Sequence, residues 1–171
     1  MTAMVVLHQD MTPDRLDRFR LAQDSDDDGF AEALHELRTT GKRSHWIWYI
    51  FPQLAGLGSS SMARAFGLDG IAEATVYFRD PILRERLLDA TAAVSERLDQ
   101  GMPLTRVMGS EIDSLKLVSS LTLFEAIAAK AGPEHERLAK LAGHVLERAE
   151  AQGYPRCSFT SKALELDRQN K

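Results

Sequence analysis

The sequence SEIDSLKLVSSLTLFEAIAAKA, residues 110–131, is apolar on nearly every side when it is wound as a helix. A helix of that kind is buried in the centre of a fold, because no side of it favours water. Gly132 is a candidate terminator. The sequence therefore predicts one long central helix over residues 110–131.

Further helical patterns lie on both sides of this central segment. Asp80 and Pro81 open a long amphipathic helix that ends before Gly101, and another helix is predicted over 133–152. Shorter helical segments are predicted at 12–23, 24–41, 59–66 and 69–78. With no internal repeat or sustained heptad, the predicted fold class is all-α, an irregular multihelical single domain of about six to eight helices. It spans residues 1–171, with poorly patterned termini at 1–11 and 156–171.

The segment 44–51 is harder to assign, because Trp46 to Phe51 form one unbroken apolar block that ends at Pro52. Its periodicity does not separate a helix from a strand. Aromatic content favours a strand, whereas Ser44 as a candidate N-cap favours a short helix. We favour the helix, because no second strand is available to pair with this segment.

The composition restricts the classes of partner. The chain has 21 Lys and Arg against 25 Asp and Glu, a net charge of −4, so no basic stripe is available for nucleic acid. The single cysteine, Cys157, excludes an intrachain disulfide, and the five histidines lack metal-ligand spacing, so neither a metal nor a cofactor is expected. No apolar stretch suits a signal peptide or a membrane span, and we expect a cytoplasmic protein without a membrane partner.

An acidic segment resembles the opening of a calcium-binding EF-hand loop, with Asp24, Asp26, Asp28 and Gly29 at the corresponding positions. The twelfth position of such a loop is a bidentate glutamate, but here it is His35. The sequence therefore favours an acidic helix start over a calcium site.

The segment GKRSHWIWYIFPQL, residues 41–54, places a cation, an imidazole, two indoles and an amide within a short stretch. Ligand pockets combine apolar walls with a few polar groups of this kind. The candidate catalytic residues are Lys42 and His45, and the candidate ligand-binding residues are Ser44, Trp46, Trp48 and Gln53. The alternative is that the aromatic residues belong to the core while the two cationic side chains are solvated.

A second candidate segment is DSLKLVSSLTLF, residues 113–124, in which polar residues project from one side of an apolar helix. Asp113 and Lys116 are candidate catalytic residues, and Ser119 and Ser120 are candidate ligand-binding residues. The alternative is that the carboxylate occupies the first helical turn, the lysine extends to solvent, and the serines bond carbonyls one turn earlier.

We expect the two segments to meet in space, although they lie far apart in the chain. Together they would form a pocket for a small molecule, nucleotide-like or ADP-ribose-like, that binds or hydrolyses its ligand. A non-catalytic protein interaction module, with the aromatic segment as a core or as a surface patch, is the alternative. The sequence leaves open whether the protein is an enzyme and what its oligomeric state is.

The run from Gly41 to Ser59 resembles the signature of the bacterial domain-of-unknown-function family 1810. Arg18-Phe19, Asp80-Pro81 and the residues around Asp113 resemble that family as well. The resemblance implies an all-helical fold like that of a mycobacterial representative, and it implies no established activity. Members are often labelled calpastatin, but nothing here resembles a flexible inhibitor repeat. The spacing of 80–87 and 109–113 is also similar to that of a helical family that processes ADP-ribose adducts, which implies an ADP-ribose-like ligand.

Overall fold

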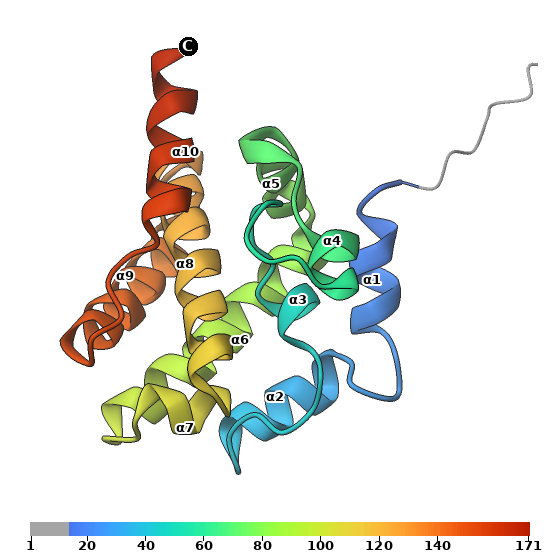
Figure 1. The fold of residues 1–171 in the computed structure, drawn as a ribbon, viewed down its shortest axis with the longest axis vertical. Coiled ribbons are helices and arrows are strands. Elements are labelled where there is room, and N and C mark those ends of the chain that lie inside the picture. The colour runs from blue at the N-terminus through green and yellow to red at the C-terminus, as the bar shows by residue number, and fades with distance from the viewer. Residues whose placement is uncertain (1–13) are drawn as a thin grey trace, which may run out of the picture.

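A computed structural model describes residues 14–171, and this part of the chain contains ten α-helices and no strand, which confirms the all-α class. In chain order the helices are α1 (Asp17–Gln23), α2 (Phe30–Arg38), α3 (Ile47–Ile50), α4 (Ser61–Phe66), α5 (Gly70–Arg79), α6 (Pro81–Asp99), α7 (Leu104–Met108), α8 (Glu111–Ala131), α9 (Glu136–Ala151) and α10 (Ser158–Gln169) (Figure 1). A short 3₁₀ helix, η1 (Pro133–His135), joins α8 to α9.

The prediction of about six to eight helices was too low, because it missed α7 and α10. Helix α7 has only five residues, too few for a periodic pattern to emerge. Helix α10 lies in the terminus 156–171, which was predicted to be poorly patterned, and it buries only Thr160 and Leu164. The other weakly patterned terminus, 1–11, and the first two residues of the helix predicted over 12–23 lie outside the described residues.

The start of α6 matches the sequence prediction in its chemistry, and α8 begins with a cap of the same kind. The Ser110 side chain accepts a hydrogen bond from the Asp113 N–H at 3.1 Å, and the Asp80 side chain accepts one from the Leu83 N–H at 2.9 Å. These caps satisfy amide groups that the first turn leaves without helical partners. The segment 44–51 is helical at α3, as favoured, but Ser44 does not cap it.

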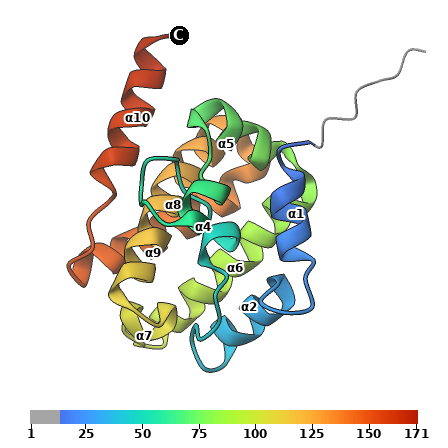
Figure 2. The same ribbon diagram turned by 45° about the vertical axis from the view of Figure 1, so that its right-hand side comes forward.

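Helix α8 occupies the centre of the fold, as its apolar sequence predicts. It packs against α9, α7, α10, α5 and α3, and eleven of its residues are buried. Phe124 is fully buried, and its ring centroid lies 5.4 Å from that of Tyr77 in α5. Figure 2 shows the other helices arranged around α8.

Helix α10 packs beside α8, and its C-terminal end extends beyond the other helices in both views (Figures 1 and 2). None of the helices in the described part of the chain combines the length and the hydropathy that crossing a membrane would require.

Candidate functional site

Two glycines allow the segment 41–54 to lie directly against the turn that leads into α8. Gly41 has a φ of 82°, and a Cβ atom there would lie 2.3 Å from the carbonyl oxygen of Arg106. Gly109 has a φ of 81°, and its Cβ would lie 2.6 Å from the carbonyl oxygen of Lys42. Only glycine tolerates this combination of backbone angle and close approach. The Lys42 N–H also donates to the carbonyl oxygen of Val107 at 2.8 Å, so the two backbones are joined here.

The carboxylate of Glu36 holds the start of the predicted segment in place. It is 4% exposed, and it accepts hydrogen bonds from the N–H groups of Arg43 and Ser44 at 2.8 and 3.1 Å. The Ser44 hydroxyl and the Trp46 indole N–H donate to the same carboxylate, the latter at 2.8 Å. Burial by itself raises the pKa of Glu36, but these donors together hold the pKa below its ordinary value. Glu36 was not among the predicted site residues, because the contacts with its donors, seven to ten positions later, form only when the chain folds across a turn.

The two predicted segments meet at an ion pair between Lys42 and Asp113. Lys42 Nζ lies 2.7 Å from Asp113 Oδ2, and the lysine side chain is only 7% exposed. The same amine donates to the Ser44 carbonyl oxygen at 2.6 Å and lies 5.1 Å from the centre of the Trp46 ring. We call Glu36, Lys42, Ser44, Trp46 and Asp113 the Glu36 network. Its charged and polar groups are satisfied by one another.

A second group of predicted residues, from α3 and α8, lies beyond the ion pair, and two of its polar groups have no hydrogen-bond partner among the described residues. Lys116 Nζ lies 3.6 Å from Asp113 Oδ1 and 4.8 Å from the centre of the Trp48 ring. The Trp48 indole nitrogen is buried without a hydrogen-bond partner among the described residues. The same holds for the hydroxyl oxygen of Ser120, one turn after Lys116 on the same side of α8. We call Trp48, Lys116 and Ser120 the Trp48 cluster.

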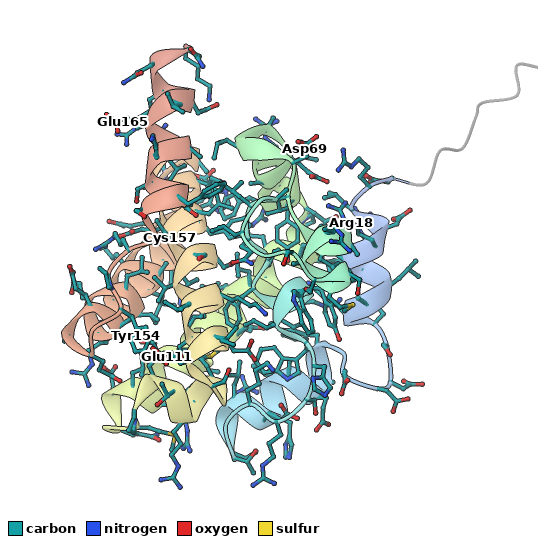
Figure 3. The ribbon with its side chains drawn as sticks, in the orientation of Figure 1. Arg18, Asp69, Glu111, Tyr154, Cys157 and Glu165 are labelled. Carbon is teal, nitrogen blue, oxygen red and sulfur yellow. The ribbon has the colours of Figure 1, made fainter. Side chains whose placement is uncertain are left out.

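Ser119 has a different environment from its neighbour Ser120. Its hydroxyl donates to the Leu115 carbonyl oxygen at 3.0 Å, as the structural alternative in the sequence analysis expected. It also faces Cys157, which lies beside α8 at the point where the chain enters α10 (Figure 3). Burial raises the pKa of the Cys157 thiol, but hydrogen bonding with Ser119 and the first amides of α10 holds the pKa below its ordinary value.

Two of the predicted site residues do not join either group. The His45 side chain is exposed and makes no hydrogen bond or ion pair with any residue in the described range. Only the His45 carbonyl oxygen is engaged, accepting from the Tyr49 hydroxyl at 3.0 Å. Gln53 is buried, and its amide donates to the Leu57 carbonyl oxygen at 2.7 Å, so it stabilises its own turn.

Most aromatic residues of the segment belong to the hydrophobic core. Trp46, Tyr49 and Phe51 are buried, whereas Trp48 is partly exposed. If the domain is an interaction module, most of the aromatic segment therefore belongs to its core. Trp46 and Phe51 are buried and cannot form part of a surface patch.

The acidic segment that resembles a calcium loop engages protein groups instead. Asp24 forms an ion pair with Arg86 at 2.7 Å, and the carbonyl oxygen of Asp28 accepts from the Tyr49 hydroxyl at 2.7 Å. Within residues 14–171, no three His, Cys, Asp or Glu side chains gather closely enough to hold a metal ion.

Comparison with known proteins identifies the family. The model of the family described as "Protein of unknown function (DUF1810)" matches residues 13–151. The chain belongs to this family. The match includes the Glu36 network and the Trp48 cluster, whereas helix α10 follows the matched residues.

One solved structure resembles the DUF1810 domain over most of its length. It is the crystal structure of the conserved hypothetical protein Rv1873 from Mycobacterium tuberculosis, with a TM-score of 0.62 and 37% sequence identity. The similarity covers 75% of this chain and 84% of the mycobacterial chain. No curated protein matches the sequence.

Proposed function

We propose that this domain binds a small anionic ligand of nucleotide-like chemistry at the Trp48 cluster. The observation that carries the proposal is the buried Trp48 indole nitrogen, which has no hydrogen-bond partner among the described residues, with the Lys116 amine 4.8 Å from the centre of the same ring system. A buried polar group without a partner is costly and uncommon in a folded protein. A ligand that accepts a hydrogen bond from the Trp48 indole would recover that cost.

A phosphate group suits this arrangement better than a neutral acceptor does. Its oxygens accept several hydrogen bonds at once, and its charge complements the ammonium group of Lys116. The partly exposed Trp48 ring offers an apolar surface next to these donors for the remainder of the ligand. The Glu36 network then has a positioning role, because it fixes the chain immediately before Trp48.

The geometry favours binding over hydrolysis. A general base must be free to accept a proton from the attacking group. Asp113, the predicted carboxylate for that task, is held 2.7 Å from one lysine amine and 3.6 Å from another. The exposed His45 side chain contacts neither of the two groups. We therefore assign no catalytic step to these residues.

The test is a titration of the purified protein with AMP, ADP-ribose and adenosine, followed by thermal unfolding and tryptophan fluorescence. AMP and ADP-ribose should raise the melting temperature, because they bind only the native state, whereas adenosine should have a much smaller effect. Lys116→Gln should weaken nucleotide binding at least tenfold. Lys162→Gln is the matched control, since this exposed lysine of α10 belongs to neither group.

Equal binding of adenosine and AMP would contradict the role of Lys116 as the charge partner. Absence of binding by all three compounds would contradict the proposal as a whole. The non-catalytic interaction module, with the aromatic segment as part of its core, would then be the better description.

A further inference from the structure

A cavity of about 380 Å³ lies at the opposite end of α8 from the predicted site. Its walls come from α5, the start of α6, the end of α8, η1 and α10, and none of its residues was a candidate in the sequence analysis. The C-terminal ends of α8 and α10 lie at the same end of the molecule in Figure 1. Its volume falls within the range of about 300–1,000 Å³ that is common for small-molecule sites.

The inner wall of this cavity is apolar. Phe78, Ile127 and Leu164 are buried core residues that line it, and Ile71 contributes a partly buried side chain. The His135 ring packs edge-on against the Phe78 ring, with the centroids 5.0 Å apart. Such a wall favours a ligand with an apolar body rather than a small inorganic ion.

The polar part of the lining is strongly cationic. It contains the side chains of Arg79, Arg84, Lys130 and Lys171, against one carboxylate, that of Asp167. The single carboxylate is already paired with Lys171 at 2.9 Å. Among the described residues, no carboxylate lies within ion-pair distance of the other three cations. This concentration of positive charge stands out because the whole chain has a net charge of −4.

One of these cations is held in position by the protein itself. Arg84 donates to the carbonyl oxygen of Phe78 at 3.2 Å, and its guanidinium carbon lies 5.8 Å from the centre of the Phe78 ring. An oriented guanidinium beside an apolar wall is suited to a carboxylate, phosphate or sulfonate group. Arg79 and Lys130 are more exposed and place two further charges at the same cavity.

From this combination we infer that the cavity is a binding site for a small amphipathic organic anion. The apolar body of the ligand lies against Phe78, Ile127 and Leu164, and its anionic group faces Arg79, Arg84 and Lys130. This site is separate from the Trp48 cluster, so it neither requires nor replaces the function proposed there. Helix α10 contributes one wall, and the bound ligand would contact both α8 and α10.

Calorimetric titration of the full chain with octyl phosphate tests this assignment, with 1-octanol, ethyl phosphate and inorganic phosphate as comparison ligands. Octyl phosphate should bind at least tenfold more tightly than 1-octanol, because the alcohol lacks the charge. It should also bind at least tenfold more tightly than ethyl phosphate, because the short chain buries little apolar area. Inorganic phosphate should give no measurable heat, and raising the salt concentration should weaken octyl phosphate binding.

The double variant Arg79→Gln/Lys130→Gln should weaken octyl phosphate binding at least tenfold. Neither side chain forms an ion pair with a described residue, so the melting temperature without ligand should change little. The matched control is Arg43→Gln/Lys162→Gln, which removes the same charges from exposed positions outside the cavity and should leave binding unchanged.

Three results would overturn the inference. The first is equal binding of octyl phosphate and 1-octanol, which would identify a purely apolar cavity. The second is unchanged binding by the Arg79→Gln/Lys130→Gln variant, which would place the ligand elsewhere. The third is no binding of octyl phosphate at millimolar concentration, which would mean that the cationic side chains serve only to keep the protein soluble.

Discussion

The Glu36 network and the Trp48 cluster lie next to each other and contain similar residue types, but they differ in how their polar groups are satisfied. In the network, the Glu36 carboxylate and the Lys42 amine each have several partners within the protein. In the cluster, the Trp48 indole and the Ser120 hydroxyl have none among the described residues. A polar residue within an apolar sequence is therefore expected to be buried. Whether it has a structural role or a binding role depends on whether other groups of the protein satisfy its hydrogen bonds.

The largest expected effect comes from a residue on which both regions depend. Phe124→Ala should lower the free energy of unfolding by about 3 to 5 kcal/mol, because it opens a cavity in the centre of α8 packing. Urea denaturation followed by circular dichroism measures this loss. A loss below about 1 kcal/mol would show that α8 is not the common support of the two regions.

A smaller loss is expected from the carboxylate that organises the network. Glu36→Gln should cost about 2 to 3 kcal/mol, because the four donors that face the carboxylate lose a charged acceptor. The same denaturation measurement applies, and Glu32→Gln, an exposed position on the same helix, is the matched control. If both variants lose the same stability, the network does not depend on the Glu36 charge.

The pH dependence of the free energy of unfolding is a second test of the role of the Glu36 carboxylate. Its pKa is below the ordinary value of 4.5 in the folded state, so the unfolded state binds the proton more readily. The stabilisation from Glu36 is therefore fully present well above pH 4.5 and is lost as the pH falls through the lower folded pKa. Denaturation of the wild type and of Glu36→Gln between neutral and acidic pH should show their difference shrinking toward acid.

The two lysines that flank Asp113 give the most direct comparison and the smallest effect. Lys42→Met should cost about 1 to 2 kcal/mol, because it leaves a largely buried carboxylate without its nearer partner. Lys116→Met should change stability by less than about 0.5 kcal/mol, because its contact with Asp113 is longer and its side chain is more exposed. Thermal denaturation of the two variants under the same conditions measures and compares their losses of stability. Equal losses would remove the distinction between network and cluster.

The sequence predicts the long elements well because their signals are local. Asp80 caps the helix that it precedes, and the apolar run of 110–131 is central. The short helix α7 has too few residues for a periodic pattern, α10 buries only two residues, and both helices were missed. Ser44 shows the limit of local reasoning, since its hydroxyl binds the Glu36 carboxylate instead of capping α3.

Partner choice in the site depends on tertiary contacts, which no local pattern specifies. Lys42 and Asp113 were both predicted, from segments expected to meet, and the structure joins these two residues in an ion pair. Glu36 was not predicted, because its donors follow it by seven to ten positions across a turn. Local sequence also does not separate Ser119 from Ser120, which are adjacent in sequence, although only the Ser119 hydroxyl has a hydrogen-bond partner.

The close approach of Gly41 and Gly109 to neighbouring carbonyl groups has a consequence for how sequences in this family vary. Each position combines a positive φ with an atom closer than any side chain would tolerate, so each is expected to stay fixed. Two positions that never change cannot change together, and they therefore produce no covariation signal. Contact prediction from aligned sequences would therefore not detect the close backbone approach at Gly41 and Gly109, which brings the two candidate segments together. Compensating pairs of substitutions should be sought instead at Lys42 and Asp113, where the two charges can be exchanged without moving the backbone.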